Sequence, residues 1–317
     1  MQSVSDVLDL GGPSPEALRP EFDGLTTEQI RDDLRDLDSF STMRMAEVMN
    51  AEDRGVPIAV AEVLPAITIA IDAIVERMRR GGRLIYVGAG TPGRLGVLDA
   101  SECPPTFDTD PELVVGIIAG GDLAIRDAVE GAEDDPDAGS ADLAAVDLRA
   151  EDTVVGISAS GRTPYVAGAI EYAHRTGALA VAVACNRGSA IGALADHAIE
   201  VIVGPEVLAG STRLKAGTAQ KLVLNMISTI VMVRLGKTFG NVMVDLQATN
   251  DKLRDRARRL VMLVTGRSAA DASQALEQAG WSVKAAVLIL ARGLTAEEAE
   301  QVLQVTPNLR AVLEGRV

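Results

Sequence analysis

The chain has 317 residues, of which 47% are hydrophobic and 24% charged, so it can bury a large core and is too apolar for a disordered protein. Lys and Arg number 30 against 45 Asp and Glu, a formal net charge of −15, and aromatic residues make up only 3%, which argues against a nucleic-acid-binding surface. Two cysteines and two histidines supply neither a disulfide framework nor a zinc cluster, and we expect a soluble protein of the reducing cytoplasm.

The first 80 residues predict a leader followed by helices. Residues 1–24 are acidic and contain Gly and Pro, so we expect a flexible leader there, with no targeting signal. A capping-box pattern predicts a helix over residues 26–37, and Ser41 is placed to cap a second one. Residues 57–80 repeat apolar side chains at helical spacing, and Pro65 is expected to kink that helix.

Short, almost wholly apolar runs follow, separated by Gly/Ser-rich loops and amphipathic segments. Continuous apolarity is typical of strands covered on both faces, and alternation with helices is typical of a parallel sheet. We therefore predict an α/β domain of three layers around a doubly wound parallel sheet of five strands. The predicted strands are residues 84–87, 113–119, 153–157, 179–184 and 199–203, and the predicted helices between and beside them lie near 94–100, 124–130, 138–145, 164–175 and 191–196.

The chain changes character after Gly210, where we predict helices and no further strand. The helical patterns cover residues 218–235, 248–265, 268–278, 282–290 and 295–304. The last three predict a small C-terminal bundle that needs support from the main domain or a partner subunit. The predicted regions are the leader at 1–24, a main domain with flanking helices at 25–266, and the three-helix bundle at 267–317.

Two Gly/Ser/Thr-rich loops are the strongest functional signal. GAGTPGR at residues 88–94 and SASGRTP at residues 158–164 each lie directly after a predicted strand and before a predicted helix. Small residues let backbone amides and hydroxyls converge on an anion, and the positive end of the helix dipole follows. A tight turn explains either loop alone, but the two together predict a phosphate site. The candidate ligands in these loops are Gly90, Thr91, Ser158, Ser160, Gly161 and Thr163.

The first loop also fits the G-x-G-x-x-G pattern of dinucleotide-binding folds, which makes an NAD-dependent oxidoreductase a rival interpretation. That fingerprint requires an acidic residue after the second strand. Asp108 and Asp110 instead precede the second predicted strand, and Asp122 lies beyond it in a glycine-rich loop. The rival also leaves the second loop unexplained, so we rank it low.

Carboxylates and cations complete the set of candidates. Glu102 is followed by Cys-Pro-Pro, which is not typical of a solvent-facing helix, whereas the acidic run at residues 130–135 is as easily a solvated turn as a functional segment. A third loop, residues 204–221, also follows a predicted strand. Its Lys215 and Arg213 could complement an anionic substrate or be ordinary surface cations.

Five segments occur in a characteristic order: GAGTPGRLG, DASECPPTF, VEGAEDD, SASGRTPY and GPEVLAGSTRLKAGTAQKLVLNM. Together they resemble the N-acetylmuramic acid 6-phosphate etherase family, whose core is a sugar isomerase (SIS) domain. The resemblance runs from about Leu25 to the C-terminus, including the terminal bundle, which is expected to be similar to a ubiquitin-associated (UBA) domain. It implies a cytoplasmic homodimer with sites at or near the subunit interface, a phosphosugar substrate, and no metal or organic cofactor, nucleic acid or membrane. The family usually has serine where this chain has Pro92, which removes a hydroxyl and an N–H from the first loop.

The family reaction removes D-lactate from the C3 ether of the sugar and adds water, leaving N-acetylglucosamine 6-phosphate. A carboxylate takes the C2 proton of the open-chain sugar, and the enolate expels the C3 oxygen, which leaves readily only when an acid protonates it. One carboxyl group must therefore stay protonated at neutral pH while the other is ionised. By matching motifs, Glu102 resembles the family's proton donor and Glu133 its other catalytic residue, the expected base; which is acid and which is base stays open. Lys215 joins the expected substrate-binding residues.

Two further interpretations remain open. The segment from GPE to KAG is also similar to regulatory proteins of sugar kinases, which bind phosphosugars without transforming them. Retention of both glutamates favours the etherase, as does a length suited to one SIS domain where those regulators carry a tandem pair. An aldose–ketose isomerase would also move the C2 proton, but it needs no acid for a C3 leaving group.

Overall fold

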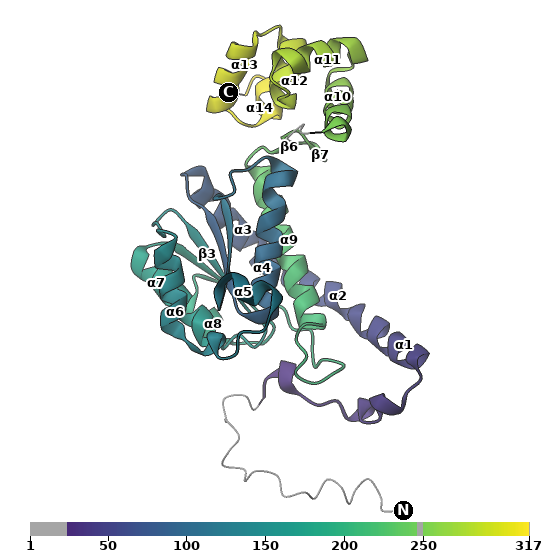
Figure 1. The fold of residues 1–317 in the computed structure, drawn as a ribbon, viewed down its shortest axis with the longest axis vertical. Coiled ribbons are helices and arrows are strands. Elements are labelled where there is room, and N and C mark those ends of the chain that lie inside the picture. The colour runs from purple at the N-terminus through teal and green to yellow at the C-terminus, as the bar shows by residue number, and fades with distance from the viewer. Residues whose placement is uncertain (1–23, 246–249, 317) are drawn as a thin grey trace, which may run out of the picture.

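The computed structural model describes residues 24–245 and 250–316. A three-layer α/β domain forms the middle of the molecule, with a helical arm before it in the chain and a group of short helices after it (Figure 1). The leader predicted at residues 1–24 lies outside the described residues except for Gly24.

The sheet has five parallel strands in the order β2-β1-β3-β4-β5, which confirms the predicted doubly wound sheet. The chain passes from β1 to the edge strand β2 and then returns to the other side of β1 to form β3. The last strand begins two residues earlier than predicted and ends earlier too. The strands are β1 (Leu84–Gly88), β2 (Val114–Ile118), β3 (Thr153–Ser158), β4 (Leu179–Ala184) and β5 (His197–Glu200).

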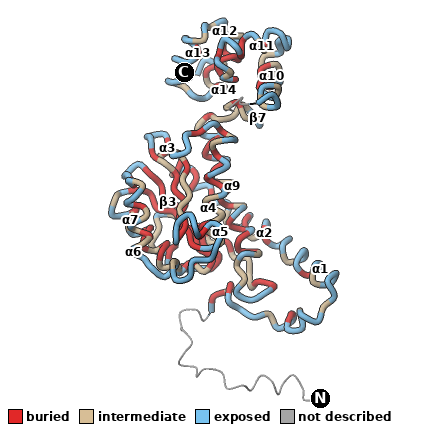
Figure 2. Tube along the Cα trace, in the orientation of Figure 1, coloured by how far each residue is buried: buried red, intermediate tan, exposed pale blue. Residues whose placement is uncertain are grey.

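Helices cover both faces of the sheet because alternate strand residues point to opposite sides. Tyr86 and Ile157 belong to the core under α3, α4 and α9, whereas Ile85 and Val154 belong to the core under α6 and α7. Figure 2 shows this burial concentrated along the strands and the inner helix faces. The helices are α3 (Leu64–Arg79), α4 (Gly90–Phe107), α5 (Gly121–Arg126), α6 (Pro136–Ala145), α7 (Pro164–Thr176), α8 (Ala190–Leu194) and α9 (Lys215–Arg234), with the 3-10 turn η7 (Ala132–Asp134) before α6.

The arm before the domain is only partly as predicted. The helix expected over residues 26–37 is wrong: three 3-10 turns lie there instead, η4 (Thr26–Glu28), η5 (Asp32–Leu34) and η6 (Leu37–Ser39). Thr26 does not cap a helix here; its amide and its hydroxyl both donate to the side chain of Asn186.

The rest of the arm confirms the predicted helices. Ser41 caps α1 (Thr42–Asp53) by accepting from the Arg44 amide, and α2 (Gly55–Glu62) continues the arm. The chain then bends by 59° before α3, and Pro65 lies in the first turn of α3, as expected for a proline-induced break.

The region after α9 contains two elements that the sequence did not predict, a hairpin and the helix α14 (Leu309–Leu313). A short antiparallel hairpin joins β6 (Thr238–Phe239) to β7 (Val242–Met243), with Gly240 at a φ of +60° in its turn, so the expectation of no further strand is wrong. Such two-residue strands are too short to show a period in the sequence. Five helices follow and share one core: α10 (Asp251–Thr265), α11 (Ala269–Gln278), α12 (Val283–Arg292), α13 (Ala296–Val305) and α14 (Leu309–Leu313). The domain boundary between residues 266 and 267 stays a prediction. The helix α10, which precedes this boundary, packs against α11 and α12, which follow it.

Among the described helices, α9 alone has the length and apolarity to cross a bilayer, and 56% of that apolar window is buried inside the protein. Such burial is typical of a core helix. In the structure, α9 packs against α2, α3 and α4.

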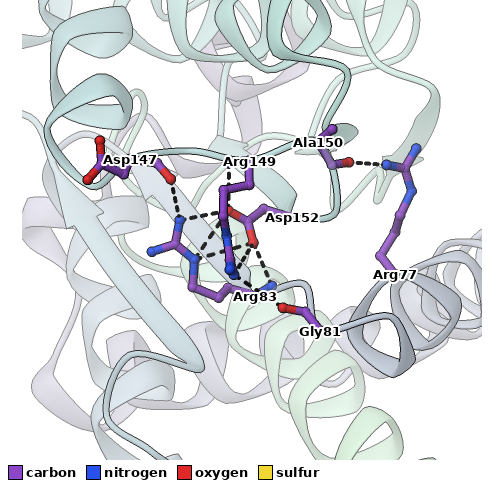
Figure 3. A network of polar contacts seen from close by, with 7 residues as sticks. All are labelled: Arg77, Gly81, Arg83, Asp147, Arg149, Ala150 and Asp152. Atoms are coloured by element: carbon purple, nitrogen blue, oxygen red, sulfur yellow. Dashed lines mark hydrogen bonds and ion pairs between the residues drawn. The ribbon is translucent and has the colours of Figure 1, made fainter.

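A buried carboxylate ties the amino-terminal ends of β1 and β3 together (Figure 3). The side chain of Asp152 is fully buried and accepts hydrogen bonds from the Arg83 guanidinium, at 2.7 Å, and from the backbone amides of Arg83 and Arg149. Burial raises the pKa of Asp152, but these donors outweigh burial and leave its pKa below the ordinary value. The network lies at the opposite edge of the sheet from the two loops.

We predict that Asp152→Asn lowers the free energy of unfolding at pH 7 by about 3 kcal/mol, because it leaves the partly buried Arg83 cation without its fully buried counter-charge. Because the folded-state pKa is depressed, this stability is present above the unfolded pKa near about 3.9 and is lost as the pH falls through the folded value. The variant should therefore lose less stability than the wild type between pH 5 and pH 2. Urea unfolding across that range measures it.

Asp147→Asn is the matched control, because Arg83 contacts only the backbone carbonyl of Asp147. Equal stability of the Asp152→Asn protein and the wild type at pH 7 would contradict the prediction.

Candidate functional site

The two loops predicted to bind phosphate lie side by side at one edge of the sheet. β1 and β3 pair directly, with Gly88 opposite Ile157, so the loops leave the carboxyl ends of neighbouring strands. The strand order also reverses between β1 and β3. In doubly wound sheets this reversal opens a crevice at the carboxyl edge, and ligands bind there.

The first loop is shaped by a close approach of α4 to β1. A Cβ atom on Gly88 would lie 2.7 Å from the Gly93 amide nitrogen, and one on Gly93 would lie 2.6 Å from the Gly88 carbonyl oxygen, so both positions require glycine. α4 begins at Gly90, which has a φ of +56° and is exposed. Pro92 is the third residue of the helix and has no N–H, so the amides of Gly90 and Thr91 are the backbone donors of this turn that face an incoming anion.

The second loop is organised around one buried hydroxyl. Ser158 Oγ lies 2.7 Å from Thr163 Oγ1 and 3.3 Å from Ser160 Oγ, and it accepts from the Gly161 amide at 2.9 Å. Gly161 has a φ of +73°, and a Cβ atom there would lie 2.4 Å from Ser189 Cβ. The structure thus brings three hydroxyls together directly before α7.

Asn186 supports this loop from behind, and the sequence analysis missed it. Its side-chain nitrogen donates to the carbonyl oxygens of Ala159 and Ser160, at 3.2 and 3.3 Å. Its side-chain oxygen accepts from the Thr26 amide at 2.8 Å, which ties the N-terminal segment to the loop. A polar residue directly after the wholly apolar strand β4 was the signal that could have identified it.

The start of α9 lies against both loops. Ala216 packs with Ala159, and a Cβ atom on Gly217 would lie 3.5 Å from Thr91 Cγ2. The buried carboxylate of Glu206 accepts from the amides of Lys215 and Ala216, at 3.0 and 2.9 Å. The positive end of this helix is therefore already neutralised within the chain, unlike the starts of α4 and α7.

Lys215 is held by the arm. Its ammonium lies 2.7 Å from Glu52 in α1, and Arg31 reaches the other oxygen of the same carboxylate at 2.5 Å. Burial raises the pKa of Glu52, but the hydrogen bonds from these two cations outweigh it and hold the pKa below the ordinary value. The lysine thus belongs to the loop region, and its charge is engaged with an anion of its own chain.

Glu133 is placed on the loop edge of the domain. It lies in η7, which packs against α7. The segment before η7 is fastened near the first loop, because Arg94 in the first turns of α4 donates to the carbonyl oxygens of Ile125 and Asp127, each at 3.0 Å. The carboxyl group of Glu133 is exposed.

Glu102 is not brought to the loops of its own chain. It follows Gly90 by twelve residues on α4, which places it about 18 Å further along the helix axis. The rotation of α4 is set by Asp99, whose buried carboxylate accepts from Tyr86 Oη, Asn225 and Ser228. Burial outweighs these donors and raises the pKa of Asp99. Glu102 then lies on the exposed side of the helix, one turn from Leu98, whose exposed fraction is 51%.

Among residues 24–245 and 250–316, no group of three or more His, Cys, Asp or Glu side chains is arranged to hold a metal ion. The cavities found there also lie away from both glutamates; one is next to the Asp152 network, at the amino edge of the sheet.

Comparisons with known proteins agree on the type of domain. The model of the glucokinase regulatory protein N-terminal SIS domain matches residues 66–174, and the SIS domain model matches residues 136–230. A phosphoheptose isomerase from Francisella tularensis has the same fold, with a TM-score of 0.50 and 21% identity over 61% of this chain and 100% of that one.

Full-length relatives are more similar. N-acetylmuramic acid 6-phosphate etherase from Streptomyces coelicolor is 58% identical, over 92% of this chain and 94% of the relative. The proteins of the same name from Pectobacterium atrosepticum and Caldanaerobacter subterraneus are 57% and 55% identical, each over 88% of this chain and 92% of the relative.

We predict that Ser158→Ala lowers the affinity for inorganic phosphate by roughly tenfold or more, because it removes the hydroxyl that orders Gly161 and Thr163. Isothermal titration measures this. Ser39→Ala, which removes an exposed hydroxyl in the arm, is the control and should bind as the wild type does. Unchanged affinity in Ser158→Ala would show that the second loop does not form the anion site.

Proposed function

Because this chain belongs to the N-acetylmuramic acid 6-phosphate etherase family, we propose that it cleaves the C3 ether of N-acetylmuramic acid 6-phosphate, releasing D-lactate and leaving N-acetylglucosamine 6-phosphate. The observation that carries the proposal is the pair of loops at the reversal between β1 and β3. They offer hydroxyls and two helix starts to a phosphate group in a protein whose net charge of −15 otherwise repels anions.

The alternative is a phosphosugar-binding regulator without catalytic activity. The regulatory-protein model does match residues 66–174, which lie within the α/β domain and the helix before it. Relatives that carry the etherase name match at 55–58% identity over 88–92% of the chain, and both candidate glutamates are present. These matches favour the enzyme.

In the proposed mechanism, the loops hold the 6-phosphate and two carboxyl groups act on the C2–C3 bond. Glu133, as base, takes the proton from C2 of the open-chain sugar. The electron pair of that C–H bond then forms the C2–C3 double bond, while the C3–O bond breaks and its electrons leave with the lactate oxygen. Glu102, as acid, gives that oxygen its proton. Water then adds across the double bond, its hydroxyl to C3 and a proton to C2, which returns both carboxyl groups to their starting states.

We propose that each site takes Glu102 from a second copy of the chain, so that the protein acts as a homodimer. The spacing along α4 keeps Glu102 about 18 Å from the loops of its own subunit. Its exposed position is also unsuited to an acid that must stay protonated at neutral pH, because that requires shielding from water. A partner covering Leu98 and Glu102 together would supply the shielding. The apolar side chains of Ile230 and Val233, exposed on α9 next to α4, favour such a contact.

The phosphate ligands, the lack of a cofactor and the cellular location are also proposals. Phosphate ligands are expected among Gly90, Thr91, Ser158, Ser160, Gly161 and Thr163, with Lys215 beside them if the substrate displaces Glu52. No metal or organic cofactor takes part in the proposed steps, and no nucleic acid or membrane is proposed as a partner. We place the reaction in the cytoplasm, in line with two buried free cysteines.

We predict that Glu102→Gln and Glu133→Gln each lower the rate of D-lactate release by about 10²–10⁴-fold while product affinity stays within about threefold, because each removes a proton-transfer group and keeps its shape. Enzymatic determination of D-lactate measures the rate. Glu130→Gln, on the same acidic segment as Glu133, is the control and should retain activity. Full activity of both variants would exclude these roles, and a wild-type protein that binds the product but releases no lactate would indicate the regulator.

Co-expressing Glu102→Gln with Glu133→Gln tests the shared site. If each site combines glutamates of two subunits, one of the two sites in a mixed dimer has both glutamates intact. Random assembly makes about half of the dimers mixed, so about one quarter of the wild-type activity should return. Glu102→Gln co-expressed with the double variant Glu102→Gln/Glu133→Gln should stay inactive. Absence of restored activity in mixed dimers, separated by two different tags, would assign both glutamates to one chain.

A further inference from the structure

Gln220 on α9 has a side-chain amide that the unliganded chain does not use. The residue is fully buried, and neither its side-chain nitrogen nor its side-chain oxygen has a hydrogen-bond partner among the described residues. Buried amides are normally hydrogen-bonded, because leaving one unpaired loses the bonds that water supplied in the unfolded chain. An amide whose two ends are unpaired within the described residues, at an otherwise well-packed helix, is available to bond a group from outside them.

The position of Gln220 points to the phosphate loops. Ala216, one turn earlier, packs against Ala159 in the second loop, and Gly217 faces Thr91 in the first. Successive helix residues turn by about 100°, so Gln220 lies between the directions of Ala216 and Gly217. Gln220 therefore lies one turn further along α9 than Ala216 and Gly217, on the side of the helix that faces both loops.

The first loop has fewer donors and fewer internal hydrogen bonds than the second. Pro92 contributes no N–H to the first turn of α4, and Gly90 is exposed and adopts a positive φ, so little within the loop fixes the orientation of Thr91. The second loop, by contrast, is already organised by Ser158 and Asn186. The side-chain amide of Gln220 therefore lies beside the first loop, which has fewer internal hydrogen bonds than the second.

We propose that Gln220 is a positioning residue for the phosphosugar: when phosphate occupies the loops, its amide bonds to the segment around Thr91 and fixes that loop beneath the anion. This inference rests on the proposed phosphosugar function. Gln220 itself does not touch the reacting atoms. It makes the ordering of the loop dependent on the ligand, because the amide gains its partners only in the occupied state.

The test is Gln220→Met, which keeps the length of the side chain and removes both polar ends. Loss of an unpaired buried amide should leave the melting temperature of the unliganded protein unchanged or higher, because no hydrogen bond is broken there. Affinity for N-acetylglucosamine 6-phosphate should fall about tenfold, the factor expected for one lost hydrogen bond. The KM for the etherase substrate should rise by a similar factor, with kcat within about threefold of the wild type.

Ile227→Val, a substitution in the buried core two turns along α9, is the control for a purely structural disturbance. It should lower the melting temperature and leave both affinity and KM unchanged. Wild-type binding by Gln220→Met would overturn the inference. So would a lowered melting temperature of the unliganded Gln220→Met and Gln220→Leu proteins, because the amide would then have a partner without ligand. A wild-type protein that does not bind the product would instead overturn the proposed function.

Discussion

The pairing of β1 with β3 is the constraint on which the site depends. Because the chain reverses its direction across the sheet at this pair, the two Gly/Ser/Thr loops emerge next to each other although 70 residues separate them. Glycine is what allows the approach: Gly88 and Gly93 let the first turn of α4 rest on the end of β1, and Gly161 lets the second loop close over Ser189. The ionic network around Asp152 holds the same two strands at their other ends, so the spacing of the loops is set from both edges of the sheet.

α4 works as a rigid spacer in this arrangement. It starts in the first loop and carries Glu102 away from it. Asp99 locks its rotation through two hydrogen bonds from α9 and one from Tyr86 in β1. A side chain at that distance cannot serve the loop at the head of its own helix. The same geometry makes Glu102 available at the surface, where a second copy of the chain can use it. In the proposed dimer, the helix would therefore link the phosphate-binding loops of one subunit to the Glu102 that the other subunit uses.

Segments from distant parts of the chain support the loops. Asn186 joins the second loop to Thr26, and Lys215 joins the start of α9 to Glu52 of the arm. Glu206 neutralises the start of α9, whereas the N-caps of α4 and α7 make no side-chain cap hydrogen bond. Through Asn186 and Lys215, the arm is therefore in contact with the region where we propose that the phosphosugar binds.

The sequence alone determined the type of fold, because five continuous apolar runs alternating with amphipathic segments allow few arrangements other than a covered parallel sheet. It also predicted where both loops lie, because Gly/Ser/Thr-rich runs directly after apolar strands mark the ends of those strands. That the loops bind phosphate stays a prediction. The helix expected at residues 26–37 failed because Thr26 bonds to Asn186, 160 residues away, and no local pattern reports such a contact. Tertiary structure likewise decides the position of Glu102 relative to the loops and the lack of hydrogen-bond partners for Gln220 among the described residues. Both depend on how α4 and α9 are rotated and packed, and local residue patterns do not encode that packing.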